Sequence, residues 1–192
     1  RIAVFQGEPF DLRLYIMVIK IDSKYYSFLY PTVFCNFENE EINKTNFLKG
    51  LGLGDNEDVS VHNPLMRKLY NLAIKVSLVL SNYLDLASKL YKFENDIGKN
   101  QNQSSNDTKF QYDLFALDIL INAKLEPYLS DIVINPLFGL VDASQRVIRE
   151  RVKIYNDIIE HYIVEYQKNG RINFDASEFV ILNRVPSETK YK

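Results

Sequence analysis

Cysteine and histidine are scarce in this chain of 192 residues, and their scarcity limits the chemistry that it can carry. The single cysteine, Cys35, has no partner within the chain, so no internal disulfide can form. Cys35 together with His62 and His161 is too small a set to build a Cys/His metal cluster. Chains without disulfides are typical of reducing compartments, and we therefore expect an intracellular, cytoplasmic protein.

Net charge and long apolar runs are also lacking. The formal net charge is −2, so no bulk positive field favours nucleic acid or anionic lipid. The most apolar segment, "LYNLAIKVSLVLSNYL", is interrupted by Lys75 and is shorter than the roughly 20 residues that cross a bilayer. We expect neither nucleic-acid nor membrane binding. The chain opens at Arg1 and runs directly into strand-like sequence, so we expect further N-terminal sequence to precede it.

Two segments of the chain are typical of β-hairpins. Residues 10–21, "FDLRLYIMVIKI", are rich in β-branched and aromatic residues, and "YYSFLY" follows after a short polar turn. The segment "TVFCNF" at 32–37 is expected to continue the same sheet. Residues 110–136, "FQYDLFALDILINAKLEPYLSDIVINP", contain two apolar runs around a polar turn near 123–125. This second segment predicts another hairpin.

Two long helices are predicted, one after each hairpin. In 64–95 and in 143–168, apolar residues recur at steps of three and four, which is typical of a helix with one core-facing side. The predicted apolar face of the first helix comprises Leu65, Leu69, Leu72, Val76, Val79, Tyr83, Leu86 and Leu90. That of the second comprises Ile148, Val152, Tyr155, Ile159, Tyr162 and Tyr166.

The remaining segments are polar and are predicted to be loops. Residues 38–60 contain "GLGLG", but the acidic residues that follow it would repel a phosphate, so we interpret it as a loop. Residues 98–109, "GKNQNQSSNDTK", have too few apolar side chains to be buried. A short strand is expected near 179–182. The order of hairpin, helix, hairpin and helix predicts an α+β domain, with an antiparallel sheet packed by two long helices.

Each run of the second hairpin carries one aspartate, Asp118 and Asp131. Both are equidistant from a turn centred between Lys124 and Leu125, so we expect them side by side on neighbouring strands. Like charges about 5 Å apart at Cβ destabilise a sheet. A shared proton, a Lys or Arg, or a divalent cation such as Mg²⁺ would neutralise the pair. The alternative is that one aspartate faces water at a strand end.

Three motifs resemble the tubulin–tyrosine ligase family of the ATP-grasp superfamily. "QYDLFALDILINAKLEPYLSDIVINP" resembles its C-terminal motif, while "PFDLRLYIMVIK" at 9–20 and "INKTNF" at 42–47 resemble two earlier ones. The resemblance covers most of 9–166 and implies an ATP-grasp-like C-terminal half over 1–168, with a flexible loop at 97–110. A C-terminal tail, 169–192, follows. The first half of such an enzyme would precede this chain.

The resemblance implies ATP-dependent ligation of an amino acid to a protein carboxylate through an acyl-phosphate, usually on a tubulin tail. It implies ATP and Mg²⁺ as cofactors, and tubulin or another carboxylate-bearing protein as partner. Asp118 and Asp131 match the acids that hold the Mg²⁺ bridging the ATP phosphates. By the same resemblance, Arg13 matches an arginine that contacts the terminal phosphate, Asp11 an acid beside the nucleotide, and Thr45 and Asn46 a pair near the ATP.

Several positions depart from the family pattern where the chemistry takes place. A family lysine is replaced by Pro9, an arginine by a position near Asn36, a histidine by Asn43, a metal-binding glutamate by Asp131 and an asparagine by Val133. Asn135 lies two residues further on and is expected to substitute as a metal ligand. Lys20, Lys44 and Lys49 are candidate replacements for the missing cations. Because one donor at a developing charge is worth about 10²–10³ in rate, these losses together predict slow catalysis or none.

Three functional hypotheses follow. The first is a ligase of this family with a partly degenerate site, acting in the cytoplasm or on microtubules. The second is a catalytically inactive relative, a pseudoenzyme that serves as a binding or structural module. The third is an unrelated α+β interaction domain. Mg²⁺-dependent ATP binding separates the first from the others.

Overall fold

The computed structural model describes residues 4–5, 8–21, 24–37, 64–98, 110–136, 145–172 and 174–185. The predicted loops at 38–60 and 98–109, and with them Thr45 and Asn46, lie outside these ranges, apart from Gly98, which ends a helix. The strands are β1 (Val4–Phe5), β2 (Glu8–Ile21), β3 (Lys24–Leu29), β4 (Phe34–Phe37), β5 (Phe110–Ile121), β6 (Pro127–Ile134) and β7 (Val180–Val185). The helical elements are α2 (Pro64–Gly98), α3 (Gln145–Ile158), the π-helical turn η1 (Ile159–Val164), α4 (Glu165–Asn169) and the 3₁₀ turn η2 (Phe174–Ala176).

The described strands form one antiparallel sheet in the order β6-β5-β2-β3-β7, and β1 and β4 also pair with β2. β2 is the central strand. β5 pairs with it from Asp11 to Ile21, while β4 and β3 share its other side, β4 along the first half and β3 along the second. Both predicted hairpins are confirmed, and the strand predicted near 179–182 is β7, which pairs with β3.

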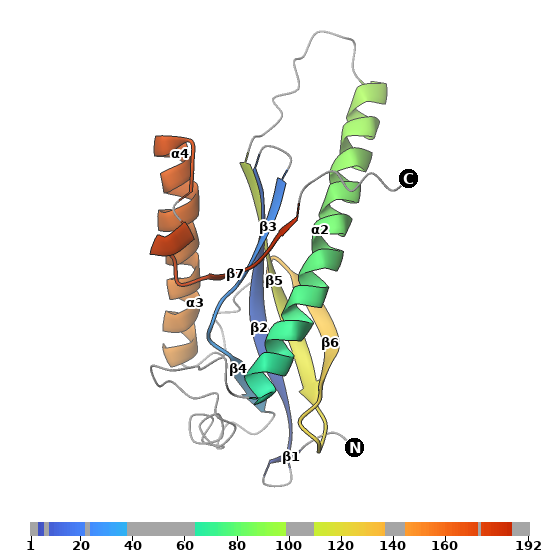
Figure 1. The fold of residues 1–192 in the computed structure, drawn as a ribbon, viewed down its shortest axis with the longest axis vertical. Helices are drawn as coiled ribbons and strands as arrows, with labels where there is room; N and C mark the ends of the chain where they lie inside the picture. The colour runs from blue at the N-terminus through green and yellow to red at the C-terminus, as the bar shows by residue number, and fades with distance from the viewer. Residues whose placement is uncertain are drawn as a thin grey trace.

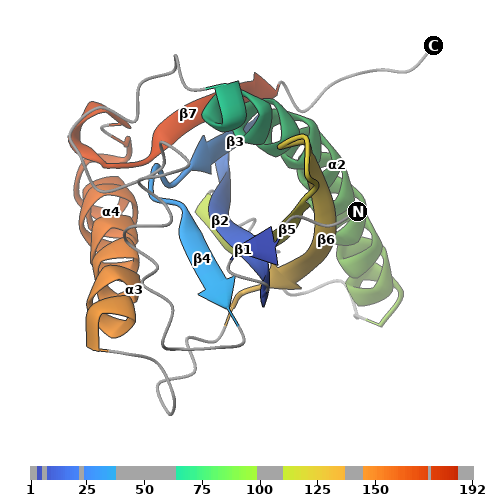
Figure 2. The same ribbon diagram turned by 90° about the horizontal axis from the view of Figure 1, so that it is seen from below.

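Helices cover both faces of the sheet, so the architecture has three layers (Figures 1 and 2). α2 packs on one face, against alternate residues of β2 such as Leu14 and Ile16. The continuous rod of α3, η1 and α4 packs on the other, against the intervening residues such as Tyr15 and Met17. Burial of both faces explains why β2 is continuously apolar from Leu14 to Ile19 instead of alternating. The predicted α+β architecture with two long helices is confirmed.

α2 begins at Pro64, as predicted, and continues three residues beyond the predicted end to Gly98. Its predicted apolar face is right only in the first half. The later positions are largely exposed: Val79 at 65%, Tyr83 at 54% and Leu86 at 58%. The predicted face repeats every 3.5 residues, whereas a straight helix repeats every 3.6, and the difference rotates the two apart by roughly 20° per heptad. None of the described helices is both long and apolar enough to span a membrane.

The second predicted helix corresponds to the rod from Gln145 to Asn169, and its predicted face is right in part, since Tyr162 is buried and Tyr155 packs against the core. Ile154, Ile158 and Tyr162 face the sheet and are fully buried. Val152 and Ile159, which were assigned to the core, are 48% and 45% exposed. Both rows of the helix carry apolar residues at helical spacing. Periodicity alone therefore does not determine which row faces the sheet.

Candidate functional site

Three charged residues form one row across three neighbouring strands. Arg13 of β2 is the Cα partner of Asp118 in β5, and Asp118 is the partner of Asp131 in β6. Partners in an antiparallel sheet project from the same face. This row lies on the face that α3 covers further along, because Tyr15 and Ala116, two residues away on their strands, pack in that core. The predicted juxtaposition of Asp118 and Asp131 is confirmed.

The register of the second hairpin contains one irregularity, and it falls beside this pair. Asp118 faces Asp131, but Ile119 faces Leu129, so Ser130 is an extra residue on β6. Such a bulge bends and twists the strand locally. The turn follows Asn122, whose side-chain oxygen accepts hydrogen bonds from the backbone N–H groups of Lys124 (2.8 Å) and Glu126 (2.9 Å).

Arg13 neutralises Asp118 through a two-pronged ion pair. Arg13 Nε donates to Asp118 Oδ1 at 2.6 Å, and Nη2 donates to Oδ2 at 2.8 Å. The side chains are only 23% and 14% exposed. The hydrogen bond with Asp118 raises the pKa of Arg13, against the opposing effect of burial. Of the three ways to neutralise the acid pair, an arginine is therefore present for Asp118.

Asp131 has a different environment from Asp118 although the two are neighbours. It is exposed, and its Oδ1 accepts a hydrogen bond from the backbone N–H of Ile132 at 2.8 Å. Mg²⁺ is commonly held by one or two carboxylates together with phosphate oxygens and water. Asp118 and Asp131 supply carboxylate oxygens, which are the type of protein ligand that Mg²⁺ takes. Within the described ranges, no group of three or more His, Cys, Asp or Glu side chains forms a metal site.

Asn135 lies at the end of β6, away from the acid pair. Its side-chain oxygen accepts from the N–H of Leu114 at 3.3 Å, and its Nδ2 donates to Asp113 at 3.3 Å. Its own N–H donates to the carbonyl of Leu114 at 2.7 Å. Leu114 is four residues from Asp118 along β5, roughly 13 Å. Asn135 therefore forms the last hydrogen bonds between β5 and the end of β6. Its role as a metal ligand stays a prediction.

Strand pairing and core packing also locate Asp11, Val133 and Lys20. Asp11 lies two residues before Arg13 on the same face of β2, and its Cα partner in β4 is Asn36, near which the family pattern has an arginine. Val133 packs against the core between the sheet and α3. Of the candidate replacement cations, Lys44 and Lys49 lie outside the described residues. Lys20 lies seven residues from Arg13 along β2, roughly 23 Å, and so does not replace a cation beside it.

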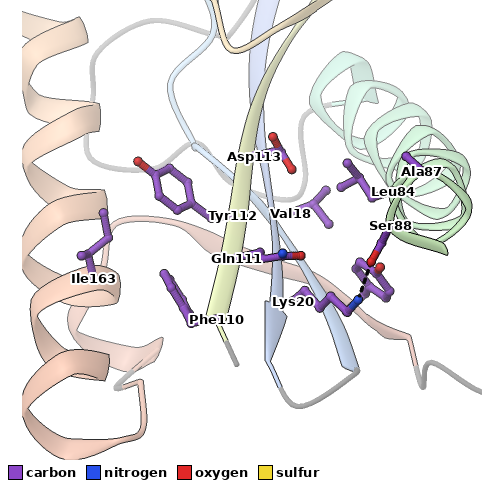
Figure 3. A pocket seen from close by; sticks show the side chains of 11 residues that line it. Val18, Lys20, Leu84, Ala87, Ser88, Phe110, Gln111, Tyr112, Asp113 and Ile163 are labelled. Carbon is purple, nitrogen blue, oxygen red and sulfur yellow. Dashed lines mark hydrogen bonds between the residues drawn. The ribbon is translucent and has the colours of Figure 1, made fainter. Parts of the chain in front are cut away.

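Lys20 instead lines a pocket of about 570 Å³ at the opposite end of the sheet, together with Tyr25 and Asp113 (Figure 3). We did not predict this pocket. Its only signal in the sequence is a charged residue near one end of each of two largely apolar strands, Lys20 in β2 and Asp113 in β5. The pocket arises because β2, β3 and β5 pair side by side and α2 crosses them, which local patterns do not reveal.

Comparison with known proteins adds no assignment to this geometry. No protein-family model matches the chain, and neither does any curated protein.

Proposed function

We propose that this chain is the C-terminal portion of an ATP-grasp-like ligase that resembles the tubulin–tyrosine ligases. The reaction would join an amino acid to a protein carboxylate, on a tubulin tail or another acceptor. One observation carries the proposal: Arg13, Asp118 and Asp131, matched separately to family motifs, lie in a single row on three adjacent strands. The two motifs that supply them are nearly 100 residues apart in the sequence, so their pairing does not follow from either motif alone.

The residues of the row have the chemistry that Mg·ATP requires. ATP supplies the activation of the acceptor carboxylate when it is bound. Asp118 and Asp131 would hold the Mg²⁺, and Arg13 would offset charge on the terminal phosphate. A guanidinium has five N–H donors, and Asp118 receives two of them, so Arg13 retains donors for a phosphate. An exposed Asp131 is accessible to a metal ion.

A second function, that of an inactive relative, is favoured by the same ion pair. Arg13 and Asp118 satisfy each other directly, so the fold needs no metal to neutralise Asp118. The family cations expected at Pro9 and near Asn36 are replaced by uncharged residues. In this alternative the row is a structural cross-strand contact, and the protein acts as a binding or structural module.

Equilibrium binding of ATP, with and without Mg²⁺, on the protein at its full natural length separates the two functions. Asp131→Asn is the sharpest variant, because Asp131 is exposed and its loss leaves the Arg13–Asp118 pair intact. The proposal expects Mg²⁺-dependent binding that weakens at least tenfold, about 1.4 kcal/mol, in Asp131→Asn. Asp85→Asn on α2 is the matched control and should bind as the natural protein does.

Absence of Mg²⁺-dependent ATP binding, or binding that Asp131→Asn does not weaken, would reject the ligase and favour the inactive relative. Transfer of labelled tyrosine, glutamate or glycine to tubulin then tests catalysis itself. Binding of Mg·ATP without transfer to tubulin would point to another acceptor or to a nucleotide-binding protein that no longer catalyses. Transfer that is lost in Asp131→Asn would establish the ligase.

A further inference from the structure

The pocket beside Lys20 is built from five elements that meet at the end of the sheet far from Arg13. On one face of the sheet it lies between α2 and the residues Val18, Lys20, Tyr25, Gln111 and Asp113, and on the other face it is lined by Phe110, Tyr112 and Ile163 of η1. Its volume is about 570 Å³, which suits a small molecule. Since Lys20 and Arg13 are separated by roughly 23 Å along β2, this pocket is distinct from the proposed ligase site.

The pocket opens at an edge of the sheet. β6 runs alongside β5 only as far as the pair of Phe115 and Ile134, so the start of β5 extends beyond it. Figure 3 shows Phe110 and Tyr112 on the side of β5 that faces the α3–α4 rod, and Asp113 on the side that faces α2. The pocket therefore surrounds the start of β5 and can be entered past the end of β6.

Lys20 is a positioned cation without an acidic partner among the residues that the structure describes. Its Nζ donates to Ser88 Oγ on α2 at 3.0 Å and lies 5.6 Å from the centre of the Tyr25 ring. Within the part of the chain that the structure describes, Lys20 makes no ion pair. The hydroxyl and the ring fix the direction of the ammonium but leave its charge unbalanced. An anion in the pocket would balance it.

Tyr25 carries a buried hydroxyl with no hydrogen-bond partner among the described residues. The residue is only 3% exposed and is the Cα partner of Lys20 on the neighbouring strand. Buried polar groups in native proteins are nearly always hydrogen-bonded, so an unpaired one on a residue that lines the pocket calls for an explanation. Burial, and then the charges of Asp85 and Asp113, raise the pKa of Tyr25 to about 12. The hydroxyl therefore keeps its proton at neutral pH and can donate it to an acceptor.

Asp113 is the complementary group, a half-buried carboxylate without a cationic partner in the described residues. The side-chain amide of Asn135, a neutral donor, donates to Asp113 Oδ1 at 3.3 Å. Burial raises its pKa, which that amide partly offsets. Asp113 pairs with Val18, two residues from Lys20, so the two charged side chains are diagonal neighbours about 7–8 Å apart at the backbone. They do not form an ion pair, because Lys20 is directed to Ser88.

We propose that this pocket binds a small zwitterion, a molecule with one carboxylate and one ammonium group on a short apolar body. Its carboxylate would accept from Lys20 and from the Tyr25 hydroxyl, and its ammonium would donate to Asp113. Val18 and Leu84 line the pocket with apolar surface for the body of the ligand. A simple anion would leave Asp113 unpaired, and a simple amine would face Lys20. Only a ligand with both charges satisfies all three polar groups.

A panel of zwitterions tests this proposal by calorimetric titration of the protein. The probes are the common L-α-amino acids and the ω-amino acids from 3-aminopropanoate to 6-aminohexanoate, and the comparators are alkylamines and alkylcarboxylates of the same lengths. We expect at least one zwitterion to bind with Kd below about 1 mM and its two single-charge comparators to bind at least tenfold more weakly. If no zwitterion binds at about 10 mM, or if a comparator binds equally well, the proposal is wrong.

Tyr25→Phe is the sharpest variant, because it removes only the unpaired hydroxyl and should not impair folding. We expect it to weaken the bound zwitterion about tenfold, as for one lost hydrogen bond to a charged group. Tyr26→Phe is the matched control, since Tyr26 packs in the core on the other face of the sheet. Lys20→Met should remove the affinity for the carboxylate end, and Asp113→Asn the affinity for the ammonium end. Unchanged affinity in Tyr25→Phe would overturn the proposed pose.

Discussion

Arg13 holds both carboxylate oxygens of Asp118 across the boundary between β2 and β5, at 2.6 and 2.8 Å. The two residues are 105 positions apart in the sequence, yet they are direct partners in the sheet. The guanidinium compensates the charge of Asp118 and so weakens its repulsion of Asp131. It also makes the row suitable for two roles, a structural contact or a site for a metal and a phosphate.

Breaking this ion pair from one side should destabilise the protein more than removing it whole. In Asp118→Leu the partly buried guanidinium of Arg13 loses its charge partner, and we expect the free energy of unfolding to fall by about 2 kcal/mol. Arg13→Met should cost a similar amount. The double variant should recover part of the loss, because no charge is left uncompensated. Urea denaturation of the four proteins measures this, and fully additive losses would show that the two side chains are not coupled.

A second polar cluster should stabilise the packing of the C-terminal segment on α3. Asp157, which is 8% exposed, accepts from Ser177 Oγ at 2.6 Å and from the N–H of Glu178 at 3.2 Å. Tyr162 donates to Ser177 Oγ at 2.8 Å. Asp157→Ala leaves two donors without their acceptor, and we expect a loss of roughly 2–3 kcal/mol in the free energy of unfolding. Glu160→Ala, an exposed change on the same rod, should leave the urea midpoint nearly unchanged.

The hairpin of Asp118 and Asp131 was the most predictable part of the candidate site. Locating the turn near 123–125 predicted the hairpin and the pairing of the two acids, although a regular ladder from the observed pair of Ile121 and Pro127 would place Asp118 opposite Ser130. The bulge at Ser130 shifts the register by one residue and so brings Asp131 opposite Asp118. A bulge depends on how the strand twists against its neighbours. The sequence around Ser130 carries no signal for it.

The partners of these acids were not predictable in the same way. Which strand lies beside β5, and in which register, depends on packing of the whole sheet rather than on any local pattern. The presence of Arg13 beside Asp118, and of Lys20 beside Tyr25 and near Asp113, follows from that packing. Local patterns were also insufficient to predict which faces of the helices are buried. Apolar residues at helical spacing predicted that helices form, but the sheet determines which row they bury.

Burial of the Tyr25 hydroxyl should make stability depend on pH in alkaline solution. Its pKa is raised from 10.0 to about 12 in the folded protein, so the unfolded chain ionises first. The folded state therefore holds more protons between pH 10 and 12, and stability falls as the pH rises through this window. The contribution is on the order of 2 kcal/mol. The free energy of unfolding of Tyr25→Phe should fall less steeply over this window than that of the natural protein, and parallel curves would contradict the assignment.

Substitutions at Asn135 should separate its structural role from the predicted role in metal binding. Asn135 has φ of 45°, a left-handed conformation that asparagine and glycine adopt more readily than other residues. Asn135→Gly loses the side-chain hydrogen bonds with Leu114 and Asp113, whereas Asn135→Ala loses them and also strains the backbone. We therefore expect Asn135→Ala to be the less stable variant by about 1 kcal/mol, measured by urea denaturation. Because Asn135 lies roughly 13 Å from Asp118 along β5, Asn135→Gly should leave Mg²⁺-dependent ATP affinity within about twofold of the natural protein. A tenfold loss in Asn135→Gly, with the fold retained, would instead support Asn135 as a metal ligand brought to the acid pair when the nucleotide binds.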